Sequence, residues 1–193
     1  MENTALGRAA SDRYHVQFPP QINLANCYQC GKCTAGCPVS SRMELAPNQI
    51  IRIVQLGLTN TALCSQAIWE CVSCQTCSAR CPKEVDCAGV MDVLREASLS
   101  FGMVSPAELP VASFQKAFLQ NIRRNGRLNE LELIAGFKTD IVFHTGRLSF
   151  LFKDATLAPK LSKRKKLHFN PEKVQDRKVV DRIFARCSKQ AGK

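Results

Sequence analysis

One cysteine pattern occurs twice in this chain, and it constrains the fold more than any other feature of the sequence. Each copy has the spacing C-x2-C-x2-C-x3-C-P, first over residues 27–38 and again over residues 71–82. Iron–sulfur proteins use this run to hold [4Fe-4S] clusters: three close thiolates bind one cluster, and the fourth binds the other. The wider gap points the fourth cysteine away from its own loop, and the proline suits a turn out of the loop. We therefore predict two clusters with crossed ligands.

The crossing assigns each of the eight cysteines to one [4Fe-4S] cluster. The first predicted cluster is bound by Cys27, Cys30, Cys33 and Cys81. The second predicted cluster is bound by Cys71, Cys74, Cys77 and Cys37. Inward-pointing amides of such tightly wound loops can hydrogen-bond the cluster sulfurs.

Two other uses of these cysteines fit less well. Zinc ribbons carry two C-x2-C pairs, without the third cysteine in phase and the C-P ending that both copies have here. Disulfides form in oxidising compartments, yet residues 1–13 have no apolar core of the length that a signal peptide needs. With 11 cysteines and no such leader, we expect the protein in the reducing cytoplasm. No run approaches about 18 apolar residues, so we expect no transmembrane segment.

The positive charge is concentrated in the last part of the chain. The formal net charge is +11, but residues 1–151 hold 14 Lys and Arg against 12 Asp and Glu, whereas residues 152–193 hold 13 against 4. With 193 residues and 45% hydrophobic content, the chain can form one domain with a modest core plus an extension. We therefore assign the basicity to an extension and not to the cysteine-bearing domain.

The 33 residues between Cys37 and Cys71 show helical periodicity. Pro47 suits the first position of a helix, which carries apolar residues at helical spacing and has Gly57 near its end. A second helix is predicted over residues 61–70 and leads into the second run. The two loops are thus expected to be joined by a helical hairpin, and the fold class is all-α.

Further helices are predicted beyond the second run. Asp86 can cap a helix that is stopped by Gly102. The next helix either starts near Pro110 or bends there. Its Val111, Phe114, Phe118 and Ile122 line one face as far as Gly126. A short helix is predicted over residues 129–135, periodicity is lost over 137–166, and a last helix is predicted to start at residues 170–172.

These elements divide the chain into three parts. Residues 1–21 are predicted to form an N-terminal arm, because Pro19 and Pro20 favour an extended segment. Residues 22–136 form the two-cluster domain. Residues 137–193 are apolar without a continuous period and are strongly basic, so we expect a C-terminal extension that docks on a partner.

The chain resembles the C subunit of heterodisulfide reductases, a small protein of the α-helical ferredoxin class. The resemblance rests on the doubled run and on four further stretches. These stretches are PNQIIR (47–52) with LG (56–57), IWEC (68–71), FQKAF (114–118) and NGRLNE (125–130). It implies an electron relay between a flavoprotein A-type subunit and a catalytic B-type subunit.

Missing motifs and spare cysteines refine this interpretation. B-type subunits of that family use adjacent cysteines, and this chain has no Cys-Cys dipeptide and no G-x-G-x-x-G cradle, so we expect no catalytic residue on it.

Three cysteines lie outside the runs. Cys64 and Cys87 are expected to pack near the clusters, with Cys87 as an alternative fourth ligand in place of Cys81, and Cys187 is expected to be an ordinary thiol.

Three other functions compete with the relay. A nucleic-acid binder is suggested by the basic run over residues 163–166, but few aromatics are interleaved and no known nucleic-acid module precedes it, so we expect no nucleic-acid partner. A free ferredoxin is disfavoured by the long basic tail. The alternative that stays open is the iron–sulfur subunit of another flavin dehydrogenase, of the glycerol-3-phosphate or glycolate type.

Overall fold

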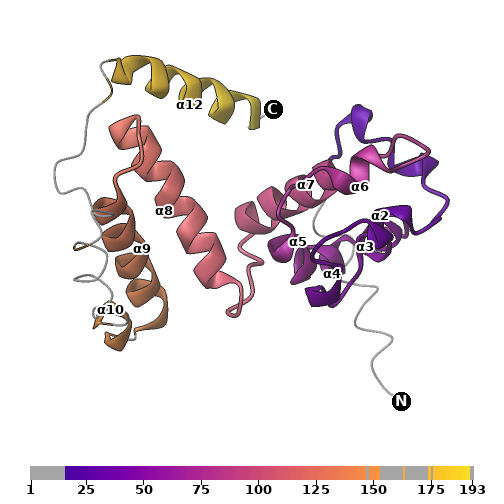
Figure 1. Cartoon of the computed structure of the whole chain (residues 1–193), viewed down its shortest axis with the longest axis horizontal. Helices are drawn as coiled ribbons and strands as arrows, with labels where there is room; N and C mark the ends of the chain where they lie inside the picture. Colours follow the sequence, from indigo (N-terminus) through magenta and orange to yellow (C-terminus); the bar gives the residue numbers. More distant parts are fainter. Residues whose placement is uncertain (1–15, 147, 153–162, 164–173, 175, 192–193) are drawn as a thin grey trace. The chain divides into compact units, whose positions relative to one another are not determined.

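The computed structural model describes residues 16–146, 148–152, 163, 174 and 176–191. Within these residues every regular element is a helix, as the all-α prediction requires (Figure 1). The elements are η1 (Pro20–Ile22), η2 (Leu24–Asn26), α2 (Lys32–Ala35), η3 (Ser40–Arg42), α3 (Pro47–Gln55), α4 (Thr59–Leu63), α5 (Ala67–Glu70), α6 (Thr76–Ala79), α7 (Cys87–Ser100), α8 (Leu109–Asn125), α9 (Glu130–Thr145), α10 (Ser149–Phe152) and α12 (Arg177–Ala191). None of the described helices is both long and apolar enough to cross a membrane.

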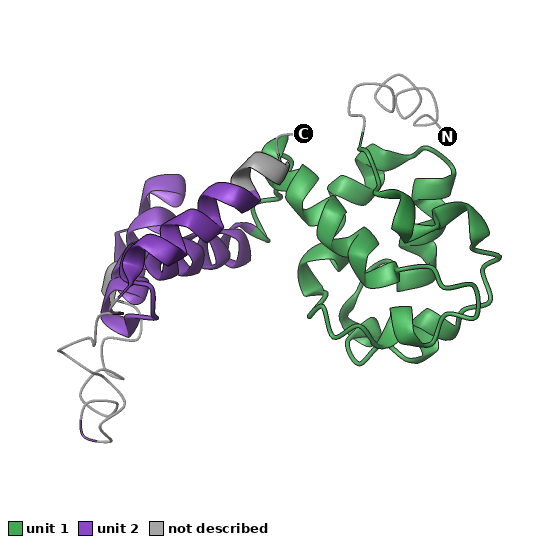
Figure 2. Ribbon diagram, turned by 90° about the horizontal axis from the view of Figure 1, so that it is seen from above, with its two compact units in different colours: residues 1–108 green, residues 109–193 purple. Residues whose placement is uncertain are grey.

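The chain folds as two compact units, residues 1–108 and residues 109–193 (Figure 2). Both cysteine runs lie in the first unit. The predicted boundary at residue 136 falls inside α9, and α8 belongs with the helices of the second unit. The predicted N-terminal arm lies mostly outside the described residues, as does the start of the last predicted helix.

Helix α7 organises the core of the first unit. It packs against α3, α4, α5, α6 and η1. The buried side chains of α7 include Val90, Met91 and Leu94, and they meet Ile50 and Ile51 of α3 in a core from which water is excluded. Because apolar burial is the main favourable term in folding, this helix holds the surrounding short elements together.

The predicted ends of α3 and α7 are confirmed. Pro47 is the first residue of α3, and Gly57 follows that helix with a positive φ of 74°. The Asp86 side chain caps α7 by accepting a hydrogen bond from the Gly89 backbone N at 3.0 Å. Gly102 follows the end of α7 and has a φ of 67°, a left-handed conformation that glycine adopts at no steric cost.

The single helix predicted over residues 61–70 is wrong, because α4 and α5 are separate. The Ser65 hydroxyl donates to Glu44 Oε1 at 2.5 Å, and the Ala67 backbone N donates both to Ser65 Oγ and to Glu44 Oε1. These acceptors replace the carbonyls that a continuous helix would supply, so the chain turns there and restarts as α5.

The second unit is built on the pairing of α8 with α9. The main helix starts at Leu109, which agrees with the first of the two predicted alternatives at Pro110. Asn121 of α8 is buried and holds the turn between α8 and α9 in place. Its side chain accepts a hydrogen bond from Asn129 N at 2.8 Å and donates one to Asn129 O at 3.1 Å. Small side chains such as Ala117 face the interior of this unit.

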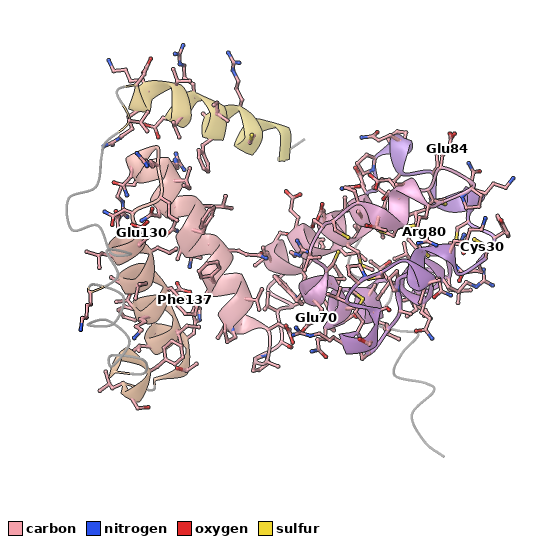
Figure 3. The ribbon with its side chains drawn as sticks, viewed as in Figure 1. Cys30, Glu70, Arg80, Glu84, Glu130 and Phe137 are labelled. Atoms are coloured by element: carbon pink, nitrogen blue, oxygen red, sulfur yellow. The ribbon has the colours of Figure 1, made fainter. Side chains whose placement is uncertain are left out.

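The predicted short helix over residues 129–135 is longer in the structure, where α9 continues to Thr145. Its N-cap Asn129 accepts from Glu132 N. Phe137 of α9, labelled in Figure 3, packs edge-on against Phe114 of α8 with ring centroids 5.8 Å apart, and it also packs edge-on against Phe150 of α10 at 5.9 Å. Helix α9 thus has apolar partners in both α8 and α10, so its apolar residues need not follow a single face.

Candidate metal centre

The two cysteine loops have the same backbone conformation. The second residue after the first cysteine of each run is left-handed, at Gln29 with φ 63° and at Ser73 with φ 49°. The residue after the second cysteine is also left-handed, at Gly31 with φ 76° and at Gln75 with φ 61°. Three of these four residues are not glycine, and such residues rarely adopt positive φ. The repeated conformation therefore belongs to the motif and is not incidental to one loop.

Each loop continues into a single helical turn that carries its third cysteine. Cys33 lies in α2 and Cys77 lies in α6, each at the second position of its helix. In both runs the amide of the fourth cysteine donates to the carbonyl three residues earlier, at 3.1 Å for Cys37 and 3.2 Å for Cys81. Helices α2 and α6 contact one another, so the two runs form one compact assembly.

A pocket brings Cys37 of the first run to three cysteines of the second. Its empty volume, open solvent included, is about 360 Å³. Its cysteines are Cys37, Cys71, Cys74 and Cys77, the four residues that the spacing of the motif assigns to the second cluster. The rest of its lining is apolar and consists of Val39, Met43, Pro47, Val72, Ala88 and Met91. Four thiols in a pocket with otherwise apolar walls form a donor set suited to an iron–sulfur cluster.

Tyr28 links the first loop to Cys81 of the second run. Its hydrogen bond with Cys30 raises the pKa of the phenol, and negative charge on Cys30 and on Cys81 adds to this effect. Cys30 and Cys81 therefore lie near the same exposed ring. In the same loop, Gln29 Nε2 donates to Cys27 Sγ at 3.4 Å.

Among the described residues, no three His, Cys, Asp or Glu side chains gather closely enough to hold one ion. Zinc binds thiolates at about 2.3 Å, whereas a cluster of eight atoms holds its ligands farther apart.

Cys87 lies between the third cysteines of the two runs. It is the first residue of α7, only 2% of it is exposed, and its side chain hydrogen-bonds to both Cys33 and Cys77. Hydrogen bonding to these two groups raises the pKa of Cys87. The same hydrogen bonds lower the pKa of Cys33 to about 6 and that of Cys77 to about 7.

The other two spare cysteines are exposed. Cys64 follows α4 at the surface, so the expectation that it packs near the clusters is wrong. Cys187 is exposed on α12. The packing predicted for Cys87 is confirmed, but its contact with both runs was not foreseen, because no sequence pattern marks it.

Two side chains from neighbouring helices support the first cysteine of each run. Gln55 Nε2 donates to the Cys27 carbonyl at 3.0 Å, and Arg95 Nη2 donates to the Cys71 carbonyl at 2.8 Å. Arg95 Nε also donates to the Ile68 carbonyl at 2.9 Å. Partly buried carbonyls at the two loop entrances thus each accept a hydrogen bond from a side chain, one from α3 and one from α7.

Gly36 and Arg80 occupy equivalent positions of the two runs and touch each other. A Cβ atom added at Gly36 would lie 2.6 Å from Arg80 Cδ (Arg80 is labelled in Figure 3). Since real Cβ atoms do not approach that closely, a larger residue at position 36 would displace the arginine stem. The two loops therefore pack directly on one another just before their fourth cysteines.

Comparisons with known proteins agree with this geometry. Residues 23–85 match a family described as the 4Fe-4S dicluster domain. Over 92 residues the chain is 36% identical to the C subunit of the H(2):CoB-CoM heterodisulfide,ferredoxin reductase of Methanothermobacter thermautotrophicus, covering 48% of this chain and 50% of that protein. Over 109 residues it is 35% identical to the iron-sulfur C 2 subunit of the CoB-CoM heterodisulfide reductase of Methanocaldococcus jannaschii, covering 56% and 58%.

A third relative is the iron-sulfur C subunit of the CoB-CoM heterodisulfide reductase of Methanopyrus kandleri, which is 34% identical over 93 residues, covering 48% of each chain. The chain thus spans about half the length of the curated relatives it matches. Over about half of its length, the chain is similar to C subunits of heterodisulfide reductases.

Proposed function

We propose that this chain binds two [4Fe-4S] clusters with crossed ligands and passes electrons through them. One cluster is held by Cys27, Cys30, Cys33 and Cys81, and the other by Cys71, Cys74, Cys77 and Cys37. The observation that carries this proposal is the pocket in which Cys37 joins three cysteines of the other run. Such clusters supply one-electron transfer, with potentials set by hydrogen bonds to the sulfurs and by exposure.

The chain's own groups shift the pKa values of the proposed ligands in both directions. Burial raises the pKa of Cys71, whereas the hydrogen bond with Thr76 lowers the pKa of Cys74. Val85 N donates to Cys81 Sγ at 3.3 Å, so this sulfur has a backbone hydrogen-bond partner. Hydrogen bonds of this kind stabilise the thiolate that an iron atom binds.

The same proposal makes the chain the electron-transfer subunit of a cytoplasmic heterodisulfide reductase-like complex. It would relay electrons between a flavoprotein A-type subunit and a catalytic B-type subunit. The names of the relatives support the complex, since each is called the C subunit of such a reductase. No catalytic residue is assigned to this chain.

The second unit is proposed to contact the catalytic subunit. Phe143 of α9 is 90% exposed and Ile183 of α12 is 54% exposed. Arg182 and Arg186 flank Ile183 at the surface of α12. Apolar anchors among positive charges suit an acidic partner face. The basic run over residues 163–166 lies almost wholly outside the described residues.

Anaerobic purification of the tagged chain from its native cells tests both parts of the proposal. We expect about eight irons and eight sulfides per chain, and co-purification of a flavoprotein and of a second, cysteine-rich subunit. Stoichiometric zinc with no charge-transfer absorption would contradict the cluster assignment. Recovery with a different flavin dehydrogenase would contradict the assignment to the reductase complex while leaving the clusters in place.

A further inference from the structure

A relay of hydrogen bonds runs from the start of α3 to the sulfur of Cys27. The Asn48 backbone N donates to Thr34 Oγ1 at 3.2 Å, and Thr34 Oγ1 donates to Asn48 Oδ1 at 2.6 Å. Asn48 Nδ2 donates to Gln29 Oε1 at 3.4 Å. Gln29 Nε2 donates to Cys27 Sγ, also at 3.4 Å. Three side chains thus connect a helix to one proposed ligand of the first cluster.

The backbone of α3 sets the direction of this relay. Asn48 is the second residue of α3, and the first four backbone N–H groups of a helix have no partner within it. This N–H can only donate, so Thr34 Oγ1 accepts from it and directs its own proton to Asn48 Oδ1. The Asn48 amide then presents its Nδ2 to Gln29, whose own Nε2 is left to face Cys27. The sulfur therefore faces a donor.

The second run begins the same relay but does not continue it. Ser78 occupies the position that Thr34 occupies in the first run. It accepts from the Ala88 backbone N of α7 at 3.0 Å and donates to Asp86 Oδ1 at 2.6 Å. A carboxylate only accepts hydrogen bonds, so Asp86 cannot pass a donor onward as Asn48 does.

Ser73 of the second run occupies the position that Gln29 occupies in the first. Its hydroxyl donates to Asp92 Oδ1 at 2.9 Å, so its donor is directed to α7. Within the described part of the chain, the relay from a helix start to the first cysteine of a run therefore exists in the first run only. The two loops share a backbone conformation but differ in this contact to a sulfur.

An amide N–H that points at a ligand sulfur affects the two oxidation states of a cluster unequally. Hydrogen bonds to the sulfurs are among the factors that set the potential of an iron–sulfur cluster. A reduced cluster carries more negative charge than an oxidised one, and a hydrogen bond strengthens with the charge of its acceptor. A donor to Cys27 thus stabilises the reduced form of the first cluster more than its oxidised form.

We propose that Gln29 is a positioning residue whose amide, oriented by Asn48 and Thr34, raises the reduction potential of the first cluster and not that of the second. This inference rests on the proposed function, since it takes two clusters as given. It does not depend on the crossing, because Cys27 serves the first cluster whether or not the fourth ligands are exchanged. The relay thereby biases an electron shared by the two clusters toward the first.

Gln29→Met and its matched control Gln75→Met test the donor in the full chain. Both residues are glutamines with positive φ in a cysteine loop, and methionine has a similar length without an amide. Gln75 is exposed, and its side chain makes no hydrogen bond among the described residues. Asn48→Ala removes the group that orients Gln29. Each protein is prepared anaerobically, its iron is measured, and its midpoint potentials are determined by redox titration followed by electron paramagnetic resonance.

We expect about eight irons in each of these three variants. One potential should fall in Gln29→Met while the other stays, and Gln75→Met should match the unaltered protein. Asn48→Ala should lower the same potential by less, with no further shift in the Gln29→Met background. In Cys74→Ala, which removes a ligand of the second cluster, Gln29→Met should still lower the remaining potential.

The inference is overturned by full iron with no shift in Gln29→Met, by an equal shift of both potentials, or by no shift in the Cys74→Ala background. Loss of iron in Gln29→Met but not in Gln75→Met would assign Gln29 a structural role and would also overturn it. Zinc in place of iron in the unaltered protein would instead overturn the proposed function itself.

Discussion

Glu108 is a carboxyl group with little access to water at the end of the first unit. It is 7% exposed. Burial raises its pKa, and the negative charges of Glu70 and Glu44 add to the effect. Glu70 is itself paired with Arg42 at 3.0 Å, which weakens the effect of its charge on Glu108. Burial is therefore the main reason that Glu108 favours its protonated form.

Glu108→Gln should stabilise the protein at alkaline pH and not at acidic pH. The folded pKa lies above the unfolded value, so the stability that Glu108 contributes is complete below about pH 4.5 and is lost as pH rises through the raised pKa. Glutamine mimics the protonated form and avoids this loss, which is on the order of 1 kcal/mol for each unit of pKa shift.

Denaturation midpoints of both proteins between about pH 5 and pH 8 test this expectation. The gain in stability should grow with pH in Glu108→Gln. The exposed Glu96→Gln variant, a control on α7, should show a constant difference. A gain for Glu108→Gln that is equal at all pH values would contradict the account.

At the scale of elements, the helices beside the loops hold the loops in place. Arg95 of α7 donates to the carbonyls of Ile68 and Cys71 and lies 3.3 Å from Asp92. Its side chain is 15% exposed. Because its guanidinium reaches two carbonyls at once, it fixes the end of α5 against the entrance of the second loop.

Arg95→Ala should cost about 2 to 3 kcal/mol of unfolding free energy, since two largely buried carbonyls lose their charged donor. It should also speed loss of the cluster bound by the second loop. Arg95→Lys should recover only part of the stability, because an ammonium group lacks the planar fork. Chemical denaturation and the rate of cluster bleaching under a chelator measure both effects.

The control for this prediction is Arg52→Ala. Arg52 lies on α3, where its Nη1 donates to Gln55 Oε1 at 3.4 Å at the surface. Its loss should cost less than about 0.5 kcal/mol. Equal effects of the two alanine variants would show that Arg95 does not brace the loop.

Local signals in the sequence were enough to predict some elements and not others. Pro47, Asp86 and Gly102 act within one turn of their own helices, and the ends they predict are confirmed. The break between α4 and α5 depends on Glu44, which is 21 residues from Ser65. Likewise the extent of α9 depends on aromatic packing with other helices, which no local pattern can reveal.

The same distinction applies to the candidate site. Spacing alone selects eight cysteines as proposed ligands and predicts their crossing, which stays a prediction. The contact of Cys87 with Cys33 and Cys77 depends on where α7 begins relative to both loops, so the sequence predicted only that it packs nearby. The supports from Gln55 and Arg95 were also missed, since each bonds a carbonyl more than 20 residues away.

At the scale of the whole molecule, the proposed functions are divided between the two units. Both cysteine runs lie in residues 1–108, whereas most of the basic excess lies beyond residue 151. The second unit has its own internal contacts: Arg123 of α8 lies 3.8 Å from Asp181 of α12 and 5.9 Å from the ring centre of Phe184. Cluster binding and partner binding are therefore expected to be separable.

Truncation after Glu108 should keep both clusters and lose the partner. The shortened chain should still contain about eight irons, because all eight proposed ligands remain. It should no longer co-purify with the catalytic subunit or reduce it. Truncation at this position leaves α9 uncut, unlike a cut at the predicted boundary. Retention of the partner, or failure to assemble any cluster, would contradict this division of roles.

The crossed ligands are the central claim, and the iron content of paired variants tests them most directly. Cys74→Ala removes the second proposed cluster, and Cys30→Ala removes the first. Adding Cys37→Ala to Cys74→Ala should leave about four irons, because both residues serve the same cluster. Adding Cys37→Ala to Cys30→Ala should remove nearly all iron. The reverse result, with iron lost in the Cys74→Ala background and kept in the Cys30→Ala background, would show that each run binds its own cluster.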